Sequence, residues 1–431
     1  MSNWTDIYKQ KLMSVEEAVK LVKSGSTICF GEHVTAPPVF AEAMAKREDL
    51  SNVNVYESFP FYPFTYLKME NADRFHPISW FLNAQDRYRF RNGEGDYIHG
   101  HLSHHLWINS EFCKYDLYVC EVSPMDENGY FSFSLGTGAN RSRMGSAEKV
   151  VLEVNPNMPW IGGDSRVHVT EVDGIIEADI PVCELTIPEI NEKDREIGRI
   201  IADMVPDGAC IQLGIGGIPN AVAESLKGKK HLGIHSEMLT ENMMGLMESG
   251  IVDNSMKQTH KGKSVAAFAI GSRGFYDYCN HNPDVEFYPY EYINDPFVIA
   301  KNNNVISINA CMEVDLIGQV CSESIGPNQY SGTGGQFDFV YGASRSKGGK
   351  SILTMYSTAK NDTVSKIRPM LQEGAVVTTP KNDVDYVVTE YGAVRLRGKT
   401  VSERAEALIS IAHPKFRSEL KEEARKLKYI K

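Results

Sequence analysis

Apolar and polar positions alternate along the chain in two periods, one typical of helices and one typical of buried strands. Residues 14–25, SVEEAVKLVKSG, have apolar side chains at a helical spacing, with Ser14 and Glu17 as a capping box and Gly25 as a stop signal. The apolar run STICFG at 26–31 follows and predicts a strand. This alternation predicts an α/β fold of mostly parallel sheets covered by helices, with ligands at the C-terminal ends of strands.

The same two patterns recur to the end of the chain. Helices are predicted at 39–47 (VFAEAMAKR), 196–205 (EIGRIIADMV) and 400–413 (TVSERAEALISIAH). Strands are predicted at 53–58 (VNVYES), 209–214 (ACIQLG), 264–271 (SVAAFAIG), 305–310 (VISINA) and 351–357 (SILTMYS).

Two segments read as diverged copies of one strand, turn and helix unit. SGSTICFGEHVTAPPVFAEAM begins at Ser24 and DGACIQLGIGGIPNAVAESL begins at Asp207. Both place glycines before and after the strand at the same offset, and VNVYES then falls opposite LGIHSE (232–237). We therefore predict two tandem, related α/β domains, residues 1–188 and 189–431, with the boundary in the proline-containing stretch 184–192.

Composition narrows the classes of partner. The formal net charge of −11 argues against a nucleic-acid binder, which needs a basic face, and favours a small-molecule substrate. The eight cysteines form no CxxC pair, which fits reduced thiols in the cytoplasm. The N-terminal residues are polar and no apolar run approaches the roughly 18 residues of a bilayer span, so we expect no membrane partner and a cytoplasmic location.

The glycine-rich turn QLGIGGIPN (212–220) follows a predicted strand. Such turns bring backbone N–H groups close to a phosphate or an oxyanion. Gly214 and Gly216 match the first two glycines of a dinucleotide fingerprint, Pro219 replaces the third, and Glu237 lies near the position of its acid. An NAD-dependent dehydrogenase is therefore a remote alternative. GGKS at 348–351 is not a P-loop, because Ser344 replaces its first glycine and a strand follows.

A second glycine-rich stretch, SGTGGQFDFVYGASRSKGGK (331–350), combines free backbone donors with nearby cations. Backbone N–H groups suit an oxyanion, and Arg345, Lys347 and Lys350 suit phosphates. The simpler interpretation is a solvated surface loop.

Several motifs together resemble one protein family. QLGIGGIPNAV, HLGIHSEM, INACMEVDLIGQV, SGTGGQFDFVYGA and the C-terminal DYVVTEYGAVRLRGKTVSERAEALISIAHPKF resemble the acetyl-CoA hydrolase/transferase family. Within it they are most similar to 4-hydroxybutyrate and butyryl-CoA:acetate CoA-transferases. The resemblance implies two CoA-transferase-type domains, CoA or acyl-CoA as substrate, no tightly bound cofactor and no metal. We also expect a homodimer or a higher homo-oligomer.

The resemblance further implies an activity. CoA would move between acetyl-CoA or butyryl-CoA and a short-chain carboxylate such as acetate, butyrate or 4-hydroxybutyrate. Transfer to a dicarboxylate such as succinate or itaconate, or acyl-CoA hydrolysis, are the alternatives.

Site residues carry over from the family motifs by position. Glu237 would attack the thioester, giving an acyl-glutamyl anhydride and then a glutamyl-CoA thioester in a ping-pong reaction. The predicted CoA-binding residues are Gln212, Leu213, Gly214, Ile215, Gly216, Met312, Gly335 and Lys360. The oxyanion or positioning candidates are Gly217, Gly332, Gly334 and Asn294, the last of which could instead cap a helix. The first-half loop GEHVTAPP lacks the Gly-Gly-Phe of related transferases with separate subunits.

Three further clusters bear on the substrate. We expect no metal site from His99, His101, His104 and His105, because neither HExxH nor a cysteine ligand accompanies them. Arginines at 87, 89 and 91 would share one face if extended; we expect a solvated basic edge, the alternative being a receptor for an acceptor carboxylate. The aromatic stretch ESFPFYPFTYL (57–67) would favour a short aliphatic acceptor if it reaches the site.

Overall fold

The computed structural model describes residues 4–186 and 188–431, and packing divides the chain into two compact units. Unit 1 comprises Met1–Thr186 and Val265–Ile293, and unit 2 comprises Ile187–Ser264 and Asn294–Lys431. The segment Val265–Ile293 thus packs with unit 1, although it lies within the predicted second domain. The predicted division between residues 188 and 189 stays a prediction.

Unit 1 is built on a seven-stranded sheet in which every adjacent pair is parallel. Its two faces are both covered, since Ile28 and Phe30 belong to one core cluster and Cys29 between them belongs to another. The strands in spatial order are β10 (Gly174–Glu177), β7 (Val150–Val154), β5 (Leu117–Val122), β1 (Thr27–Phe30), β2 (Val53–Glu57), β3 (Phe75–Ser79) and β4 (Asp96–Tyr97).

Capping boxes start two of the α-helices of unit 1, α2 (Val15–Ala18) and α4 (Ala84–Arg91). The predicted capping box of Ser14 and Glu17 is confirmed, and it starts a helix that continues as a 3-10 turn. The α-helices are α1 (Trp4–Lys11), α2 (Val15–Ala18), α3 (Pro38–Ala45), α4 (Ala84–Arg91), α5 (His105–Phe112), α6 (Asn140–Gly145), α10 (Arg273–Cys279) and α11 (Tyr290–Ile293). Short strands complete the unit: β6 (Tyr130–Ser132) pairs with β9 (Arg166–His168), and β8 (Gly162–Gly163) pairs with β16 (Val285–Phe287).

Unit 2 is built on a six-stranded sheet, parallel except at one edge. Its strands in spatial order are β12 (Gly233–Ile234), β11 (Cys210–Leu213), β17 (Val305–Ala310), β22 (Lys350–Thr354), β26 (Tyr386–Thr389) and the antiparallel β27 (Gly392–Arg395). Short strands β18 (Glu313–Asp315), β19 (Val320–Cys321) and β25 (Ile367–Arg368) form a separate small sheet, and β20 (Ser324–Ile325) pairs with β21 (Asn328–Gln329).

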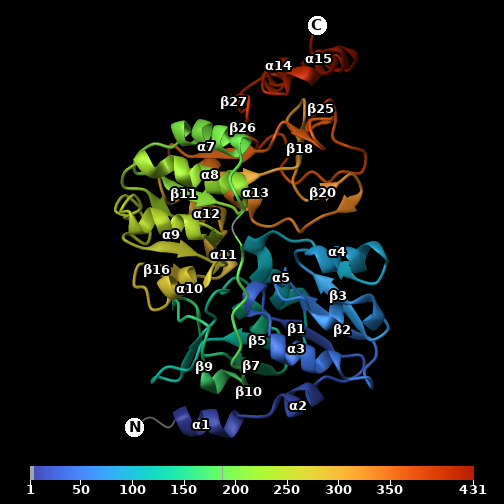
Figure 1. The fold of residues 1–431 in the computed structure, drawn as a ribbon, viewed down its shortest axis with the longest axis vertical. Helices are drawn as coiled ribbons and strands as arrows, with labels where there is room; N and C mark the ends of the chain where they lie inside the picture. The colour runs from blue at the N-terminus through green and yellow to red at the C-terminus, as the bar shows by residue number, and fades with distance from the viewer. Residues whose placement is uncertain (1–3, 187) are drawn as a thin grey trace. The chain divides into compact units, whose positions relative to one another are not determined.

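Helices pack in pairs on the sheet of unit 2. Helices α7 (Glu192–Met204) and α8 (Gly217–Ser225) lie against one another, as do α14 (Val401–Ser410) and α15 (Arg417–Lys426) near the C-terminus (Figure 1). The remaining α-helices are α9 (Glu241–Glu248), α12 (Pro296–Ile299) and α13 (Gln336–Arg345). A mixed α/β fold with mostly parallel sheets is therefore confirmed.

The two main sheets share their topology. From β2 the order in unit 1 is β2, β1, β5, β7, β10, and from β12 the order in unit 2 is β12, β11, β17, β22, β26. Thr27 pairs with Asn54 in one sheet, and Cys210 pairs with Gly233 in the other. This is the register that the aligned sequence copies require, and it supports the predicted duplication.

Two local predictions need correction. The predicted strand 264–271 is divided into β14 (Ser264–Ala266) and β15 (Phe268–Ala269), because the Ala267 carbonyl accepts the N–H groups of Thr137 and Gly138 instead of continuing a ladder.

The arginine-rich segment was expected to form a solvated basic edge, with its arginines on one face if extended; it is helical instead, and Arg91 is exposed whereas Arg89 is buried. Asn83 and Asp86 form a capping box that starts helix α4 there. The Arg89 side chain is fully buried and donates to the carbonyls of four residues, Tyr66, Lys68, Phe75 and Glu94. Arg89 therefore anchors the chain locally and is not available to a substrate.

The aromatic stretch 57–67 is divided between two environments of unit 1. Phe64 and Tyr66 are part of the core cluster around Phe30, whereas Phe59 and Phe61 are partly exposed and contact the ring of His33. No helix in the described residues has the length and apolar character that a bilayer crossing requires.

Candidate active site

Glu237 follows the second strand of unit 2. It lies between β12 and β13 (Met238–Leu239), and its side chain is partly exposed. The preceding residue, Ser236, is buried, and its hydroxyl donates to the carbonyl oxygen of Leu213 at 3.4 Å. Glu237 thus stands at the C-terminal ends of two adjacent parallel strands, where α/β folds place their ligands.

Asn294 holds one oxygen of the Glu237 carboxylate. Its Nδ2 donates to Glu237 Oε2 at 3.0 Å, and the Asn294 side chain is fully buried. Asn294 was alternatively predicted to cap a helix. The cap of α12 is the next residue, Asp295, whose side chain accepts the N–H of Phe297 at 2.7 Å. Asn294 therefore faces the carboxylate.

Gly335 is in close contact with the same pair. An ideal Cβ on Gly335 would lie 1.8 Å from Glu237 Oε2 and 2.1 Å from Asn294 Nδ2, so only glycine fits without displacing one of them. Gly335 is the N-cap of the ten-residue helix α13, and Gly334 before it has a left-handed φ of 61°. The carboxylate thus lies at a helix N-terminus, where backbone N–H groups stabilise negative charge.

The first glycine loop lies between β11 and α8. Gly216 has a φ of 116° and is the N-cap of α8, for which no described side chain makes a capping hydrogen bond. Ile215 is 45% exposed at the tip of the loop. The uncapped N–H groups at the start of α8 are available to a ligand oxygen.

A carboxylate faces this loop from helix α7. An ideal Cβ on Gly217 would lie 2.6 Å from Asp194 Oδ2. The Tyr356 hydroxyl donates to Asp194 Oδ1 at 2.6 Å, and burial together with this hydrogen bond raises the pKa of Tyr356 to about 12. Asp194 thus remains a hydrogen-bond acceptor beside the loop.

Gln212 and Leu213, two predicted CoA-binding residues, are buried in strand β11. Gln212 Oε1 accepts from Ser307 Oγ at 2.9 Å and from Asn309 Nδ2 at 3.0 Å. This amide network ties β11 to β17. The side chain of Gln212 is therefore engaged within the sheet.

Two other predicted CoA-binding residues lie on separate turns. Met312 is partly exposed after β17, and its N–H donates to the Cys321 carbonyl. Lys360 is exposed in the turn between β23 (Thr358–Ala359) and β24 (Val364–Ser365), where Lys360 and the next two residues all have left-handed φ angles of 51°, 54° and 59°. Backbone strain of this kind is concentrated at functional sites.

Gln336 was not predicted from the sequence, although it directly follows Gly335. Its Nε2 donates to the Ala310 carbonyl at 2.8 Å, and its Oε1 accepts from Ser322 Oγ at 2.8 Å and from Thr379 Oγ1 at 3.1 Å. A sequence signal for Gln336 did exist, because it is an amide residue directly after a glycine turn. Of the predicted residues, the contacts bring together Glu237, Asn294 and Gly335, with Gly334 in the turn beside them.

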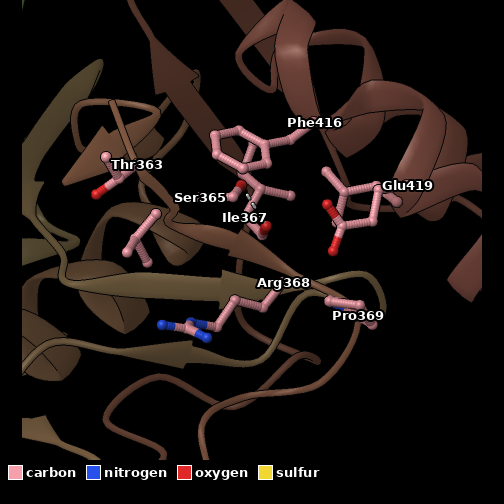
Figure 2. A pocket seen from close by; sticks show the side chains of 9 residues that line it. Thr363, Ser365, Ile367, Arg368, Pro369, Phe416 and Glu419 are labelled. Carbon is pink, nitrogen blue, oxygen red and sulfur yellow. Dashed lines mark hydrogen bonds between the residues drawn. The ribbon is translucent and has the colours of Figure 1, made fainter. Parts of the chain in front are cut away.

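A pocket of about 230 Å³ lies elsewhere in unit 2. It is lined from the segments 363–369 and 416–420, and Figure 2 shows the ring of Phe416 beside Ile367, with Arg368 below. Arg368 pairs with Glu313, with 2.5 Å between Nε and Oε2. Its described lining includes none of the predicted site residues, so this pocket is separate from the Glu237 cluster.

Of the histidine cluster, His105 is buried whereas His99 and His104 are exposed, and seven of the eight cysteines are buried. His105 is buried with its ring 4.3 Å from that of Trp80, and the described residues contain no group of three or more His, Cys, Asp or Glu able to hold a metal ion. The eight cysteines, all within the described residues, are free thiols.

Comparison with known proteins places this geometry in context. The sequence matches the acetyl-CoA hydrolase/transferase N-terminal domain over residues 2–185 and the C-terminal domain of the same name over residues 271–424. It is 47% identical to succinyl-CoA:cyclohexane-1-carboxylate CoA transferase of Geobacter metallireducens, over 98% of this chain and 97% of that protein. It is 43% identical to 4-hydroxybutyrate coenzyme A transferase of Clostridium kluyveri, over 98% and 99%. The crystal structure of RipA from Yersinia pestis superposes with a TM-score of 0.94 at 38% identity, covering all of both chains.

Proposed function

The chain belongs to the acetyl-CoA hydrolase/transferase family and is a CoA-transferase, and from this we propose that it works through Glu237 in a ping-pong reaction. It moves CoA between acetyl-CoA or butyryl-CoA and a short-chain carboxylate, namely acetate, butyrate or 4-hydroxybutyrate. Relatives named for 4-hydroxybutyrate and for butyryl-CoA and acetate support this substrate class.

The reaction conserves an acyl bond at every step. A carboxylate oxygen of Glu237 attacks the thioester carbonyl and the C–S bond breaks, so that CoA leaves as a thiolate and an acyl-glutamyl anhydride remains. The thiolate attacks the glutamyl carbonyl, which releases the first acid and forms glutamyl-CoA. The acceptor carboxylate reverses both steps, so that the new acyl-CoA leaves and Glu237 returns to a free carboxylate.

One observation carries this proposal: Asn294 and Gly335 hold the partly exposed Glu237 between them. The hydrogen bond from Asn294 fixes one carboxylate oxygen and so orients the proposed nucleophile. The turn at Gly334 and Gly335 supplies backbone N–H groups beside the atom on which negative charge develops. A carboxylate is a weak nucleophile, and this fixed geometry compensates for that weakness.

CoA recognition is divided between two loops in this proposal. The uncapped start of α8 at Gly216 receives a neutral oxygen, because Asp194 opposes a second negative charge there. Lys360, exposed on its strained turn, pairs with a phosphate of CoA.

Succinyl-CoA is a second candidate donor. The relative at 47% identity is named for succinyl-CoA and cyclohexane-1-carboxylate, an acceptor with an apolar ring. A dicarboxylate acceptor held by Arg89 is disfavoured, since that side chain is buried on four carbonyls. Assaying acetyl-CoA, butyryl-CoA and succinyl-CoA against a panel of monocarboxylates and dicarboxylates identifies the pair used.

The test of the mechanism is to trap the covalent intermediate. Enzyme incubated with acetyl-CoA and then treated with borohydride should carry a reduced adduct at Glu237 in a peptide map. Glu237→Ala should lose both adduct and transfer, and Glu237→Asp, one methylene short, should lose most of its rate while folding normally. Full transfer by Glu237→Ala would refute the role of Glu237.

We also propose a location and an assembly state. Eight free thiols fit a reducing cytoplasm. A homodimer or higher homo-oligomer stays our proposal, and sedimentation of the purified enzyme measures it directly.

A further inference from the structure

The Gly335 turn has little freedom of position. Its backbone lies so close to Glu237 and Asn294 that even a methyl group would overlap both. A small shift of the turn would therefore move the N–H groups relative to the carboxylate. Misplacement of about 1 Å in such a site costs on the order of 100-fold in rate.

Two sets of contacts fix the helix that the turn begins. Further along α13, Gly342 packs on Ile299 of α12, where an ideal Cβ would lie 2.7 Å from the Ile299 Cβ. At the first position of α13, the side chain of Gln336 makes three hydrogen bonds to three separate segments of unit 2. Gln336 is 9% exposed, so these bonds are shielded from water and are individually stronger than surface bonds.

Unit 1 contains a second copy of this arrangement. Residues 136–140, GTGAN, lead into the first position of α6 and then to β7, just as residues 332–336, GTGGQ, lead into the first position of α13 and then to β22. At the matching position Asn140 is also buried, and its Nδ2 donates to Thr35 Oγ1 at 2.9 Å while its Oδ1 accepts the N–H of Glu32 at 3.3 Å. An amide residue anchors the glycine turn in both units.

We propose that Gln336 is a positioning residue for the reaction of Glu237. It holds the Gly335 turn against the carboxylate by binding Ala310, Ser322 and Thr379 at once. Its side-chain hydrogen bonds go to these three residues and not to Glu237. This inference rests on the proposed function, because it assigns Gln336 to the step in which glutamyl-CoA forms.

The experiment measures how fast and how completely Glu237 is modified. Gln336→Met keeps the volume and removes all three hydrogen bonds. Rapid mixing with acetyl-CoA followed by a borohydride quench gives the rate of adduct formation and the fraction of enzyme trapped. We expect a rate at least about tenfold below the wild type, trapping of the same final fraction, and unchanged affinity for CoA.

Two companion variants separate positioning from folding. Gln319→Met is the matched control, since Gln319 donates from Nε2 to Asp315 Oδ2 at 2.7 Å in a turn outside the site, and it should react at the wild-type rate. Gln336→Glu keeps two acceptor atoms but loses the donor to Ala310 while the new carboxyl is ionised. Burial favours the protonated carboxyl, so its rate relative to the wild type should rise as the pH is lowered and protonation restores a donor.

The possible outcomes are distinct. If Gln336→Met forms the adduct at the wild-type rate, or merely lowers the trapped fraction, Gln336 is a structural residue and the inference is overturned. That result leaves the proposed function standing as long as Glu237→Ala forms no adduct. Continued transfer by Glu237→Ala would overturn both.

Discussion

The two units have the same strand order and register but differ at the ends of matching strands. The strands compared are the first parallel pair of each unit, β1 with β2 in unit 1 and β11 with β12 in unit 2. Counting four residues on from the paired Asn54 and Gly233 places Ser58 of unit 1 opposite Glu237 of unit 2. Only unit 2 has a carboxylate, the proposed nucleophile, at this position.

The turn after the first strand is filled in unit 1 and open in unit 2. An ideal Cβ on Gly31 would lie 2.4 Å from the Thr35 carbonyl oxygen and 2.7 Å from Cys120 Sγ. At the matching Gly214, a Cβ would meet no heavy atom of residues 4–186 or 188–431 within 4 Å. Unit 1 closes this turn by packing, whereas unit 2 leaves room for a ligand.

The second glycine turn shows the same contrast. In unit 1 the N–H of Ala139 donates to Glu32 Oε1 at 2.9 Å, and Glu32 lies 3.9 Å from the buried guanidinium of Arg143. Burial raises the pKa of Glu32, and Arg143 opposes that rise. In unit 2 the matching Gly335 lies against Glu237. The same turn thus donates to an internal carboxylate in unit 1 and lies against the proposed nucleophile in unit 2, which indicates that its backbone suits an anionic oxygen.

The largest expected effect comes from exchanging the residues of these turns. Gly335→Ala would put a methyl group on Glu237 Oε2, and we expect kcat to fall at least about 100-fold. Ala139→Gly, the reverse change in unit 1, should keep transfer within about twofold, since it creates no overlap and loses one buried methyl. Steady-state transfer assays measure kcat of the two variants, and circular dichroism checks that both are folded. Near-normal kcat in Gly335→Ala would show that the contact does not constrain the reaction.

The next effect is on stability and belongs to unit 1. Glu32→Ala leaves the N–H of Ala139 without its acceptor and removes the carboxylate nearest to the fully buried Arg143. Breaking a buried charge pair from one side costs about 3–5 kcal/mol, so urea unfolding should detect the loss easily. Glu32→Gln keeps an acceptor oxygen and should cost less. A change below about 1 kcal/mol in Glu32→Ala would mean that this carboxylate is not the internal ligand of the turn.

Matching strands also differ in buried acids. Glu121 on β5 pairs in register with Glu153 on β7, and the corresponding residues of unit 2 are Ala310 and Thr354. Burial raises the pKa of Glu153 from its ordinary 4.5 to about 7, although the N–H groups of Val39 and Phe40 donate to its carboxyl oxygens and lower it. The native state therefore holds a proton that the unfolded chain releases.

A pH dependence follows from this difference. Between pH 4.5 and about pH 7 the folded protein binds more protons at Glu153 than the unfolded chain, so its contribution to stability falls as pH rises. Over this pH range the contribution of Glu153 to the free energy of unfolding falls by on the order of 3 kcal/mol. The free energy of unfolding of Glu153→Gln should depend less on pH than that of the wild type. The variant should therefore gain stability relative to the wild type as the pH rises through this range. Parallel curves for the two proteins would contradict the shifted pKa.

Much of this architecture is readable from the sequence, because its signals are local. The capping box at Ser14 and Glu17, the glycines around the strands and the copy of VNVYES in LGIHSE all depend on neighbours in the chain. These signals predict the alternating elements, the duplication and the strand end that carries Glu237. Asn294 and Gly335 were predicted through family motifs, and the structure adds that they meet at one carboxylate.

What the sequence did not reveal depends on distant contacts. The burial of Arg89 is fixed by carbonyls from three other segments, which no spacing within RYRFR indicates. Gln336 acquires its role from Ala310, Ser322 and Thr379. The packing of Val265–Ile293 with unit 1 likewise reflects tertiary contacts and leaves no mark in local periodicity.

The smallest expected effect concerns a feature that the two units share, the glycine before the first strand. Gly25 and Gly208 precede the first strand of each unit with φ angles of 82° and 72°, and their N–H groups donate to the carbonyls of Ser51 and Lys230, both at 2.9 Å. A Cβ at Gly208 would be in ordinary contact with Met256 at 3.4 Å, and one at Gly25 would meet no described heavy atom within 4 Å. The cost of alanine is therefore backbone strain alone, about 1 kcal/mol at either position.

Because the backbone strain is the same, Gly25→Ala and Gly208→Ala should lower the free energy of unfolding, measured with urea, by equal amounts. Gly25→Asn and Gly208→Asn serve as controls and should each cost less than alanine, because asparagine tolerates left-handed backbone. A loss at one glycine that exceeds the other by more than about 1 kcal/mol would show that the turns differ in the backbone itself. Matching losses would confine the divergence of the units to the strand ends and the turns beside them. The differing pairs are Ser58 and Glu237, Gly31 and Gly214, and Ala139 and Gly335, and they distinguish the filled turns of unit 1 from the proposed reactive site of unit 2.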